Sequence, residues 1–574
     1  MNNDNKNFIL FAVLAALIMF GGQYVVSYFF PSNPPTTQIV DGKSKPLPNP
    51  GANSGANTGA VPAADGSAAV RDRNIVLGET PRVRIDTPNL QGSINLKGAR
   101  IDDLVLVTYK ETIDKNSPPI RLLSPSGTAG AYFAGFGWRD DGLKPPASDT
   151  IWKATGDVLS IGKPVTLDAT NASGQRFRIQ ISVDDGYMFT VRQTVANAGA
   201  GPVPVAAYGL INRIGIFHDP DTWTVQIGPM SAHNGGAHYD VNFSDVDTGP
   251  QKFNTTGGWL GFTDKYWLTA LVPDQGVAFD GQFRPGPNKA YQADYAVTPR
   301  LVQPGSAVTQ TSRFFAGAKE VKLLDRYTDK EGIALFDHGI DWGWFRIVEK
   351  PIFYYLHWLF QMVGNFGVAI ILLTVTIRGL MFPIAQRQFA SMAAMRALQP
   401  KMKALQERYK DDKQKQQQEV MALYKTEKVN PLAGCLPTFL QIPIFYALYK
   451  VLLLTIEMRH QPFILWIKDL SAHDPLTPLN LFGYLAFTPP AFLAIGIIPI
   501  LLGISMYFQF KLNPAPMDET QKQVFAIMPW VLMFVMAPFA VGLQVYWITS
   551  NVLTILQQKL LYSRHPGLKE AAAK

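Results

Sequence analysis

Two kinds of hydrophobic pattern divide this chain. Residues 8–30 carry no charge, and five later apolar segments carry at most one charge each: 364–384, 432–456, 488–510, 523–536 and 542–560. Because a membrane-spanning helix needs about 20 mostly apolar residues, the pattern predicts six spans. The first run exceeds the ~7–15 apolar residues of a secretory signal. Residues 1–30 are therefore predicted to be an uncleaved signal anchor.

The region between the first two spans has a different pattern of apolar and polar residues. Residues 177–183 alternate strictly between apolar and polar side chains, residues 184–186 form a turn, and alternation resumes over 187–191. This pattern predicts a β-hairpin, and similar strands are expected at 101–109, 203–210 and 277–283. Residues 71–336 are thus predicted to be an all-β sandwich, closed by a helix over 316–335. Residues 31–70, rich in Pro, Gly, Ala and Asn, are expected to be a flexible linker.

Three further segments have amphipathic or charged patterns. Residues 337–362 combine aromatic side chains with a few charges, which favours an interfacial amphipathic helix; the alternative is the start of the second span. Residues 386–430 lack glycine and are rich in Gln, Lys, Ala and Met, which indicates a helical hairpin. Residues 363–562 are therefore expected to form a helical core that includes this hairpin, and residues 563–574 are expected to form a tail.

The distribution of basic residues predicts the orientation. The 386–430 hairpin has ten Lys and Arg against five Asp and Glu. Basic loops stay on the cytoplasmic side of a membrane. Alternation of the spans then places the hairpin, the 511–522 loop and both termini in the cytoplasm. Residues 31–340 and the 457–487 loop lie outside.

The composition indicates a chain with one water-soluble part and one membrane part. It is 47% hydrophobic and 17% charged, with a mean hydropathy of +0.03. These averages lie between those of a soluble protein and of a transporter, as a β domain joined to six spans requires. The net charge of +8 is explained by basic cytoplasmic segments. The single cysteine, Cys435, excludes a disulfide framework and any multi-cysteine metal site.

The β region offers no convincing catalytic pattern. Residues 156–164 resemble a phosphate-binding loop, but they have five residues between the glycines and Pro in place of Ser or Thr. His218, His233 and His238 lack carboxylates at metal-ligand spacing. We therefore expect no catalytic site, no metal and no cofactor.

Arg378 is the most informative residue of the predicted spans. A charge at the centre of a span costs about 2.5–3.5 kcal/mol on insertion scales, and the other spans contain no Asp or Glu. Arg378 therefore either faces a hydrated cavity or snorkels to the cytoplasmic interface. Polar side chains in the same halves of two spans fit an inward-open groove, although helix–helix hydrogen bonds are the alternative; they are Thr374, Gln544, Thr549, Ser550 and Asn551.

Several motifs occur in the order in which one family carries them. They are Thr374-Val-Thr-Ile-Arg378-Gly-Leu-Met-Phe-Pro383, Leu398-Gln-Pro-Lys401, Met421-Ala-Leu-Tyr-Lys425, Lys428-Val-Asn-Pro-Leu432, Cys435-Leu-Pro437, Gln441-Ile-Pro-Ile-Phe445, Leu465-Trp-Ile-Lys-Asp-Leu470 and Ser550-Asn551. Together they resemble the YidC-type membrane protein insertases (YidC/Oxa/Alb). The anchor and the β domain resemble the Gram-negative form, with its periplasmic β-supersandwich and five-helix conserved core.

This resemblance implies an insertase and chaperone that works alone or beside the Sec translocon. The groove would be open to the cytoplasm and to lipid and closed outside, and Arg378 would draw in acidic segments. Trp547 occupies a position where the family commonly has Tyr. The implied groove residues are Arg378, Thr374, Gln544, Trp547, Ser550 and Asn551, and the implied surface along which a substrate helix slides contains Ile442, Pro443 and Phe445.

The resemblance also implies partners and a location. The partners would be nascent inner-membrane proteins, the Sec translocon and membrane lipids, with the ribosome and signal-recognition machinery at the hairpin and tail. The location would be the bacterial inner membrane. A solute transporter would instead show paired intramembrane charges or inverted repeats. An intramembrane protease would need a catalytic pair within the spans, and an envelope-anchoring protein would not need Arg378.

Overall fold

The computed structural model describes residues 37–40, 43–46, 61–63, 65, 70–139, 142–215, 225–409, 412–427, 436–485, 495–512 and 519–564. The chain divides into two compact units. The β unit comprises Asn53–Arg346 and Leu454–Arg459, and the helical unit comprises Met1–Ala52, Ile347–Leu453 and His460–Lys574. The predicted anchor at 1–30 lies outside the described residues.

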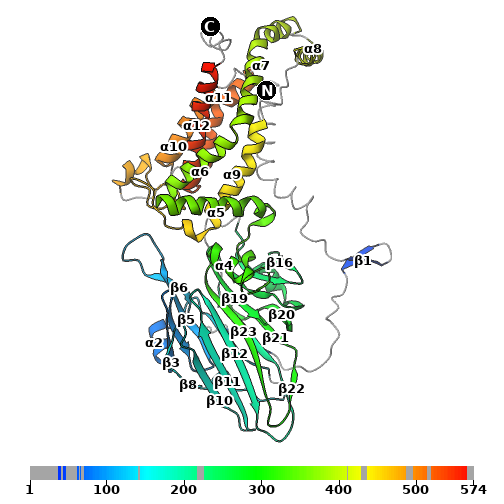
Figure 1. The fold of residues 1–574 in the computed structure, drawn as a ribbon, viewed down its shortest axis with the longest axis vertical. Coiled ribbons are helices and arrows are strands. Elements are labelled where there is room, and N and C mark those ends of the chain that lie inside the picture. The colour runs from blue at the N-terminus through cyan, green and yellow to red at the C-terminus, as the bar shows by residue number, and fades with distance from the viewer. Residues whose placement is uncertain are drawn as a thin grey trace. The chain divides into compact units, whose positions relative to one another are not determined.

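Two large sheets form the β unit (Figure 1). The nine-stranded sheet has the order β16 (Gly236–His238), β15 (Gly228–His233), β18 (Trp259–Thr263), β19 (Trp267–Pro273), β23 (Ala307–Ala318), β12 (Met188–Asn197), β11 (Gln175–Val183), β10 (Val165–Thr170) and β8 (Lys153–Thr155). The ten-stranded sheet has the order β17 (Gln251–Thr256), β20 (Ala278–Pro285), β21 (Ala290–Val297), β14 (Ala207–Ile214), β7 (Tyr132–Trp138), β5 (Arg100–Lys110), β4 (Leu90–Asn95), β3 (Arg82–Asp86) and β9 (Val158–Leu159), with β6 (Pro119–Leu123) beside β5.

Short elements complete this unit. They are β13 (Val203–Val205) paired with β22 (Arg300–Val302), the helices α2 (Arg73–Gly78), α3 (Phe243–Thr248) and α4 (Val321–Asp329), and the 3-10 turns η1 (Pro287–Lys289), η2 (Phe336–Gly339), η3 (Gly343–Phe345) and η5 (Ile456–Met458). Apart from β3 with β9, the named strand pairs described in this unit are antiparallel. The predicted sandwich is therefore confirmed.

The core lies between the two sheets and is rich in aromatic side chains. Phe314 on β23 contacts Phe136 on β7 with their ring centres 6.1 Å apart, and Phe262 on β18 contacts Phe283 on β20 at the same separation. Burying one such side chain stabilises the fold by about 1.5–3 kcal/mol. Strict alternation along β11 sends every second side chain into this core, which explains why the strand could be recognised from its pattern.

The predicted hairpin is confirmed, and two other predictions in this region are wrong in detail. Strands β11 and β12 pair from Gln175 opposite Asn197 to Val183 opposite Phe189. The strand expected at 203–210 is two strands, because the chain leaves β13 and joins a different sheet as β14. The helix expected at 316–335 is only α4, since β23 continues to Ala318 in register with β19.

The predicted linker contains some ordered structure. Within residues 31–70, β1 (Thr37–Val40) pairs with β2 (Lys43–Pro46). Val61 packs in a cluster with Phe133 and Leu210 of the ten-stranded sheet. Apolar burial therefore anchors part of this segment to the β unit, although its composition suggested a free tether.

A short segment from the second half of the chain also belongs to the β unit. Within Leu454–Arg459, Arg459 donates hydrogen bonds to the carbonyl oxygens of Lys110 (2.7 Å) and Glu111 (3.1 Å). The Glu457 carboxylate accepts a hydrogen bond from the first backbone N–H of α4, that of Val321, at 3.1 Å. The β unit is thus built from two stretches of chain that lie far apart in the sequence.

The helical unit contains longer helices. They are α5 (Arg346–Val363), α6 (Phe366–Leu380), α7 (Phe382–Arg408), α8 (Lys413–Thr426), α9 (Leu436–Leu454), α10 (Ile497–Leu512), α11 (Glu519–Met536) and α12 (Val541–Arg564), with the 3-10 turn η6 (Pro478–Gly483) before α10. Among the described helices, none combines the length and the hydropathy of a membrane span.

Two helix boundaries differ from the sequence prediction. The interfacial helix expected at 337–362 begins only at Arg346, because Asp337 and Trp342 are buried and the Asp337 carboxylate accepts from Arg346. Helix α7 begins at Phe382, so it includes the end of the apolar run expected at 364–384. In the region of the expected hairpin, α7 and α8 are in contact through Leu398, Met402 and Tyr424.

Candidate functional site

Arg378 and Ser550 meet between helices α6 and α12. Arg378 lies in the last turn of α6, and its Nε donates to the Ser550 hydroxyl at 3.0 Å, with Nη2 as a second donor. Ser550 itself is buried. Within the part of the chain that the structure describes, no carboxylate forms an ion pair with Arg378. The guanidinium, with its five donors, is therefore held by a neutral oxygen.

The side chains of three other predicted groove residues form hydrogen bonds within α6, to the turn between α11 and α12, and to α10. Thr374 is buried and donates to the carbonyl oxygen of Ile370 at 2.6 Å. The Gln544 amide donates to two carbonyl oxygens in the turn between α11 and α12, both at 2.9 Å. Asn551 donates to Ser505 on α10 at 2.9 Å. In this geometry Thr374 bonds within its own helix, Gln544 bonds to a turn, and Asn551 makes a helix–helix contact.

The predicted slide residues lie on one part of α9. Ile442 is 58% exposed and Pro443 is also exposed. Phe445 is half-buried and packs edge-on against Trp547 of α12, with ring centres 5.1 Å apart. The structure therefore brings Phe445 and Trp547 together, although they were assigned to different surfaces.

Another polar contact between helices was not predicted. Gln441 of α9 donates to the hydroxyl of Tyr546, which is buried on α12. Gln441 is an amide within an otherwise apolar stretch of α9, and such a side chain seeks a partner. That signal was present in the sequence, but nothing in it indicated that the partner would be Tyr546.

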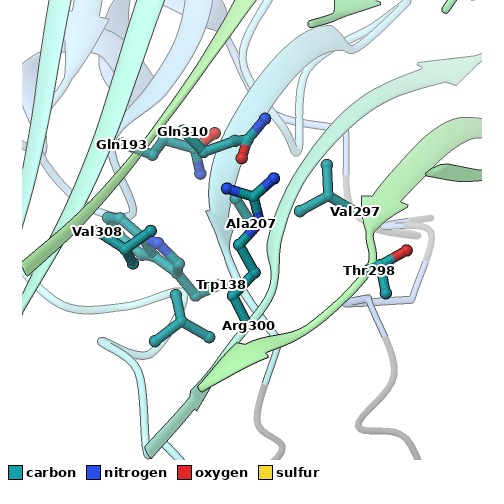
Figure 2. A pocket seen from close by; sticks show the side chains of 9 residues that line it. Trp138, Gln193, Ala207, Val297, Thr298, Arg300, Val308 and Gln310 are labelled. Atoms are coloured by element: carbon teal, nitrogen blue, oxygen red, sulfur yellow. The ribbon is translucent and has the colours of Figure 1, made fainter. Parts of the chain in front are cut away.

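The described part of the β unit contains a small recess. Trp138, Gln193 and Arg300 are among its lining residues (Figure 2), and its volume of about 10 Å³ is that of a single water site. The Gln193 amide nitrogen donates to the carbonyl oxygen of Gly137 at 2.6 Å. The recess is thus a gap between packed strands.

The candidate histidines do not converge on a metal. His233 and His238 stack with their ring centres 3.8 Å apart, and burial together with His238 lowers the pKa of His233 to about 4. Their planes are nearly parallel, at 11°. His218 lies outside the described residues, which contain no cluster of three or more metal-binding side chains.

The fold and the polar contact at Arg378 define a class of protein with a β-sandwich domain followed by a core of apolar helices. Residues 82–355 match the YidC periplasmic domain, and residues 358–569 match the family described as 60Kd inner membrane protein. The chain belongs to this family of membrane protein insertases.

Similar proteins extend over nearly the full chain. The membrane protein insertase YidC of Zymomonas mobilis is 49% identical over 99% of this chain and 97% of its own length. The protein of the same name from Methylorubrum extorquens is 43% identical over 99% of this chain and 96% of its own. A crystal structure described as an active YidC insertase with its first transmembrane domain resolved covers 86% of this chain and 94% of its own, at 18% identity and a TM-score of 0.36.

Proposed function

We propose that this chain inserts and helps to fold inner-membrane proteins through a hydrophilic groove open to the cytoplasm and to lipid. Its six spans would place both termini in the cytoplasm and the β unit in the periplasm. The charge-poor runs and the basic 386–430 segment support this topology. The insertase names of relatives that match almost the full chain support the activity.

The observation that carries the proposal is the state of Arg378. Its guanidinium contacts a hydroxyl on α12 and, among the described residues, has no carboxylate partner. A cation in a low-dielectric site attracts acidic groups strongly because little water screens it. An acidic tail of a substrate would therefore enter beside α6 and α12, next to Ser550. The proposed groove would also include Thr374, Gln544, Trp547 and Asn551.

The energetics of insertion fit such a groove. A polar tail has to pass about 30 Å of hydrocarbon, and a hydrated path through part of that depth shortens the costly segment. The substrate's apolar helix then moves into lipid beside the exposed Ile442 and Pro443 of α9 and the neighbouring Phe445. Burial of that helix, at about 25 cal/mol per Å² of apolar surface, supplies the driving force.

The partners follow from the same proposal. Nascent inner-membrane proteins are the substrates, with the Sec translocon and membrane lipids as neighbours. The basic 386–430 segment and the 563–574 tail would receive the ribosome and the signal-recognition machinery. The docking role is supported by the contact between α7 and α8. This contact consists of an apolar cluster and an ion pair of 2.6 Å between Lys401 and Glu427, the residue that follows α8.

Reconstitution tests the activity directly. The purified full-length chain in liposomes is expected to insert a small single-span substrate, so that the substrate's tail becomes protected from added protease. Empty liposomes are the control. Protection equal to that of empty liposomes would refute the insertase proposal.

Charge substitution at Arg378 tests the groove. Arg378→Ala is expected to reduce insertion of substrates with acidic tails severalfold, whereas Arg378→Lys preserves most of it because the charge remains. Arg176→Ala, which removes an exposed charge from β11, serves as the matched control. Equal insertion by Arg378→Ala and the unaltered chain would contradict an electrostatic groove.

A further inference from the structure

One loop of the helical unit contacts the first turns of three helices. We name residues 461–476 the capping loop. At α6, the Asn365 amide donates to the carbonyl oxygen of Phe463 at 2.9 Å. The Phe463 ring also lies against Gly367, where an added Cβ would be 2.0 Å from a ring carbon. The loop therefore packs on the start of α6 at a distance that only glycine permits.

At α10 the contact is made by a buried carboxylate. Asp474 is 2% exposed, and its Oδ2 accepts the backbone N–H of Ile498 at 2.8 Å. Its Oδ1 accepts the indole N–H of Trp466 and the backbone N–H of Leu476, both at 3.1 Å. A Cβ on Gly496 would lie 2.5 Å from the Cβ of Asp474. Asp474 thus caps α10 from more than twenty residues away, in a space fitted closely around it.

At α12 the loop supplies backbone oxygens. The N–H groups of Val541 and Gly542 donate to the carbonyl oxygens of Ala472 and Leu470, both at 2.9 Å. Leu470 is fully buried. The same loop therefore accepts hydrogen bonds from the starts of α10 and α12 and holds the start of α6.

These contacts answer a definite physical need. The first N–H groups of a helix have no partner within it, and that end of the helix carries a partial positive charge. Asp474 has no basic side chain as a partner among the described residues, so the N–H donors and the α10 terminus stabilise its charge. Because Arg378 lies in the last turn of α6, about 18 Å along the axis from its start, the loop and the Arg378–Ser550 contact occupy opposite ends of this helix.

We propose that Asp474 is a positioning residue that keeps the end of the helical unit away from Arg378 closed. The inference rests on the proposed groove, which has to be sealed at one end if solutes are not to leak during insertion. Without the carboxylate, the α10 terminus loses its cap, Trp466 and Leu476 lose their acceptor within the capping loop, and the closed end opens.

The test uses the full-length chain in liposomes that contain a trapped small fluorescent dye. Dye leak, substrate insertion and the midpoint of thermal unfolding are measured together. Asp474→Ala and the near-isosteric Asp474→Asn are expected to leak severalfold faster than the unaltered chain, since neither offers a charged acceptor to Ile498. Gly496→Ala is expected to leak similarly, because its methyl group displaces the Asp474 side chain without altering the carboxylate.

Asp469→Ala is the matched control. Asp469 lies in the same loop, but it accepts from Ser471 within the loop and touches no helix N-terminus among its described hydrogen bonds. It is expected to leave the leak unchanged. If the unaltered chain inserts substrate and the Asp474 and Gly496 variants lower the unfolding midpoint without leaking, the inference is overturned. Failure of the unaltered chain to insert would instead refute the proposed function.

Discussion

The buried Glu457 carboxylate makes the β unit sensitive to pH. Burial raises the pKa of Glu457 from its ordinary 4.5 to about 7; the nearby Glu320 adds to the rise, whereas the Val321 N–H and Lys322 oppose it. Around it, Tyr109 and Tyr187 donate to Glu320 at 2.9 and 2.8 Å. The folded chain therefore retains a proton on Glu457 that the unfolded chain releases at lower pH.

The sign and size of the effect follow from this difference. Between pH 4.5 and about 7 the folded state binds more protons than the unfolded state, so the free energy of unfolding falls as pH rises. At about 1.4 kcal/mol per pKa unit, the full loss is about 3 kcal/mol, and most of it occurs between about pH 5 and pH 8. Above that range this contribution is constant.

Urea unfolding of the full-length chain in detergent, at pH 5 and pH 8, measures the effect. Glu457→Gln keeps an oxygen for the Val321 N–H but cannot ionise, so its stability is expected to lack about 2–3 kcal/mol of the pH dependence. Glu79→Gln, at an exposed carboxylate of the same unit, is the control and is expected to behave like the unaltered chain. Equal pH dependence in Glu457→Gln and the unaltered chain would refute the reasoning.

Two further predictions concern the sandwich. Arg213→Ala leaves the Asp264 carboxylate buried without the partner that it now holds at 2.8 Å, so the β unit is expected to lose about 3–5 kcal/mol in urea unfolding; a loss below about 1 kcal/mol would contradict a buried ion pair. Gly317→Ala places a methyl group 2.1 Å from the Tyr187 ring and is expected to lower the midpoint of thermal unfolding. Gly201→Ala, with open space around it, is the control, and equal midpoints would refute the predicted clash.

Local patterns predicted the elements well where one physical rule dominated. Strict alternation in β11 identified both the strand and its hairpin with β12, because each buried position faces the same core. The prediction was wrong at 316–335, where the pairing of β23 with β19 extends the strand through residues with helical character. The pairing with β19 sets the end of β23, and the periodicity of a single sequence carries no information about such long-range pairing.

The candidate site was predictable only in part. A charge in an apolar helix identified Arg378, and polar residues near the end of the chain included its partner Ser550. The contacts of Thr374 and Gln544 were harder to predict. A polar side chain that bonds its own helix or turn has the same sequence signature as one that lines a groove. The cap that Asp474 makes on α10 joins positions whose proximity depends on the fold of the whole unit.

The membership of Leu454–Arg459 in the β unit has a consequence for how the chain is made. Synthesis proceeds from the N-terminus at about 5–20 residues per second, and about a hundred residues separate this segment from Arg346. For several seconds, therefore, Arg459 cannot contact Lys110 and Glu457 cannot contact α4, because neither residue has been synthesised. During that interval the β unit lacks the segment Leu454–Arg459. The β unit can therefore be complete only after α9 has been translated.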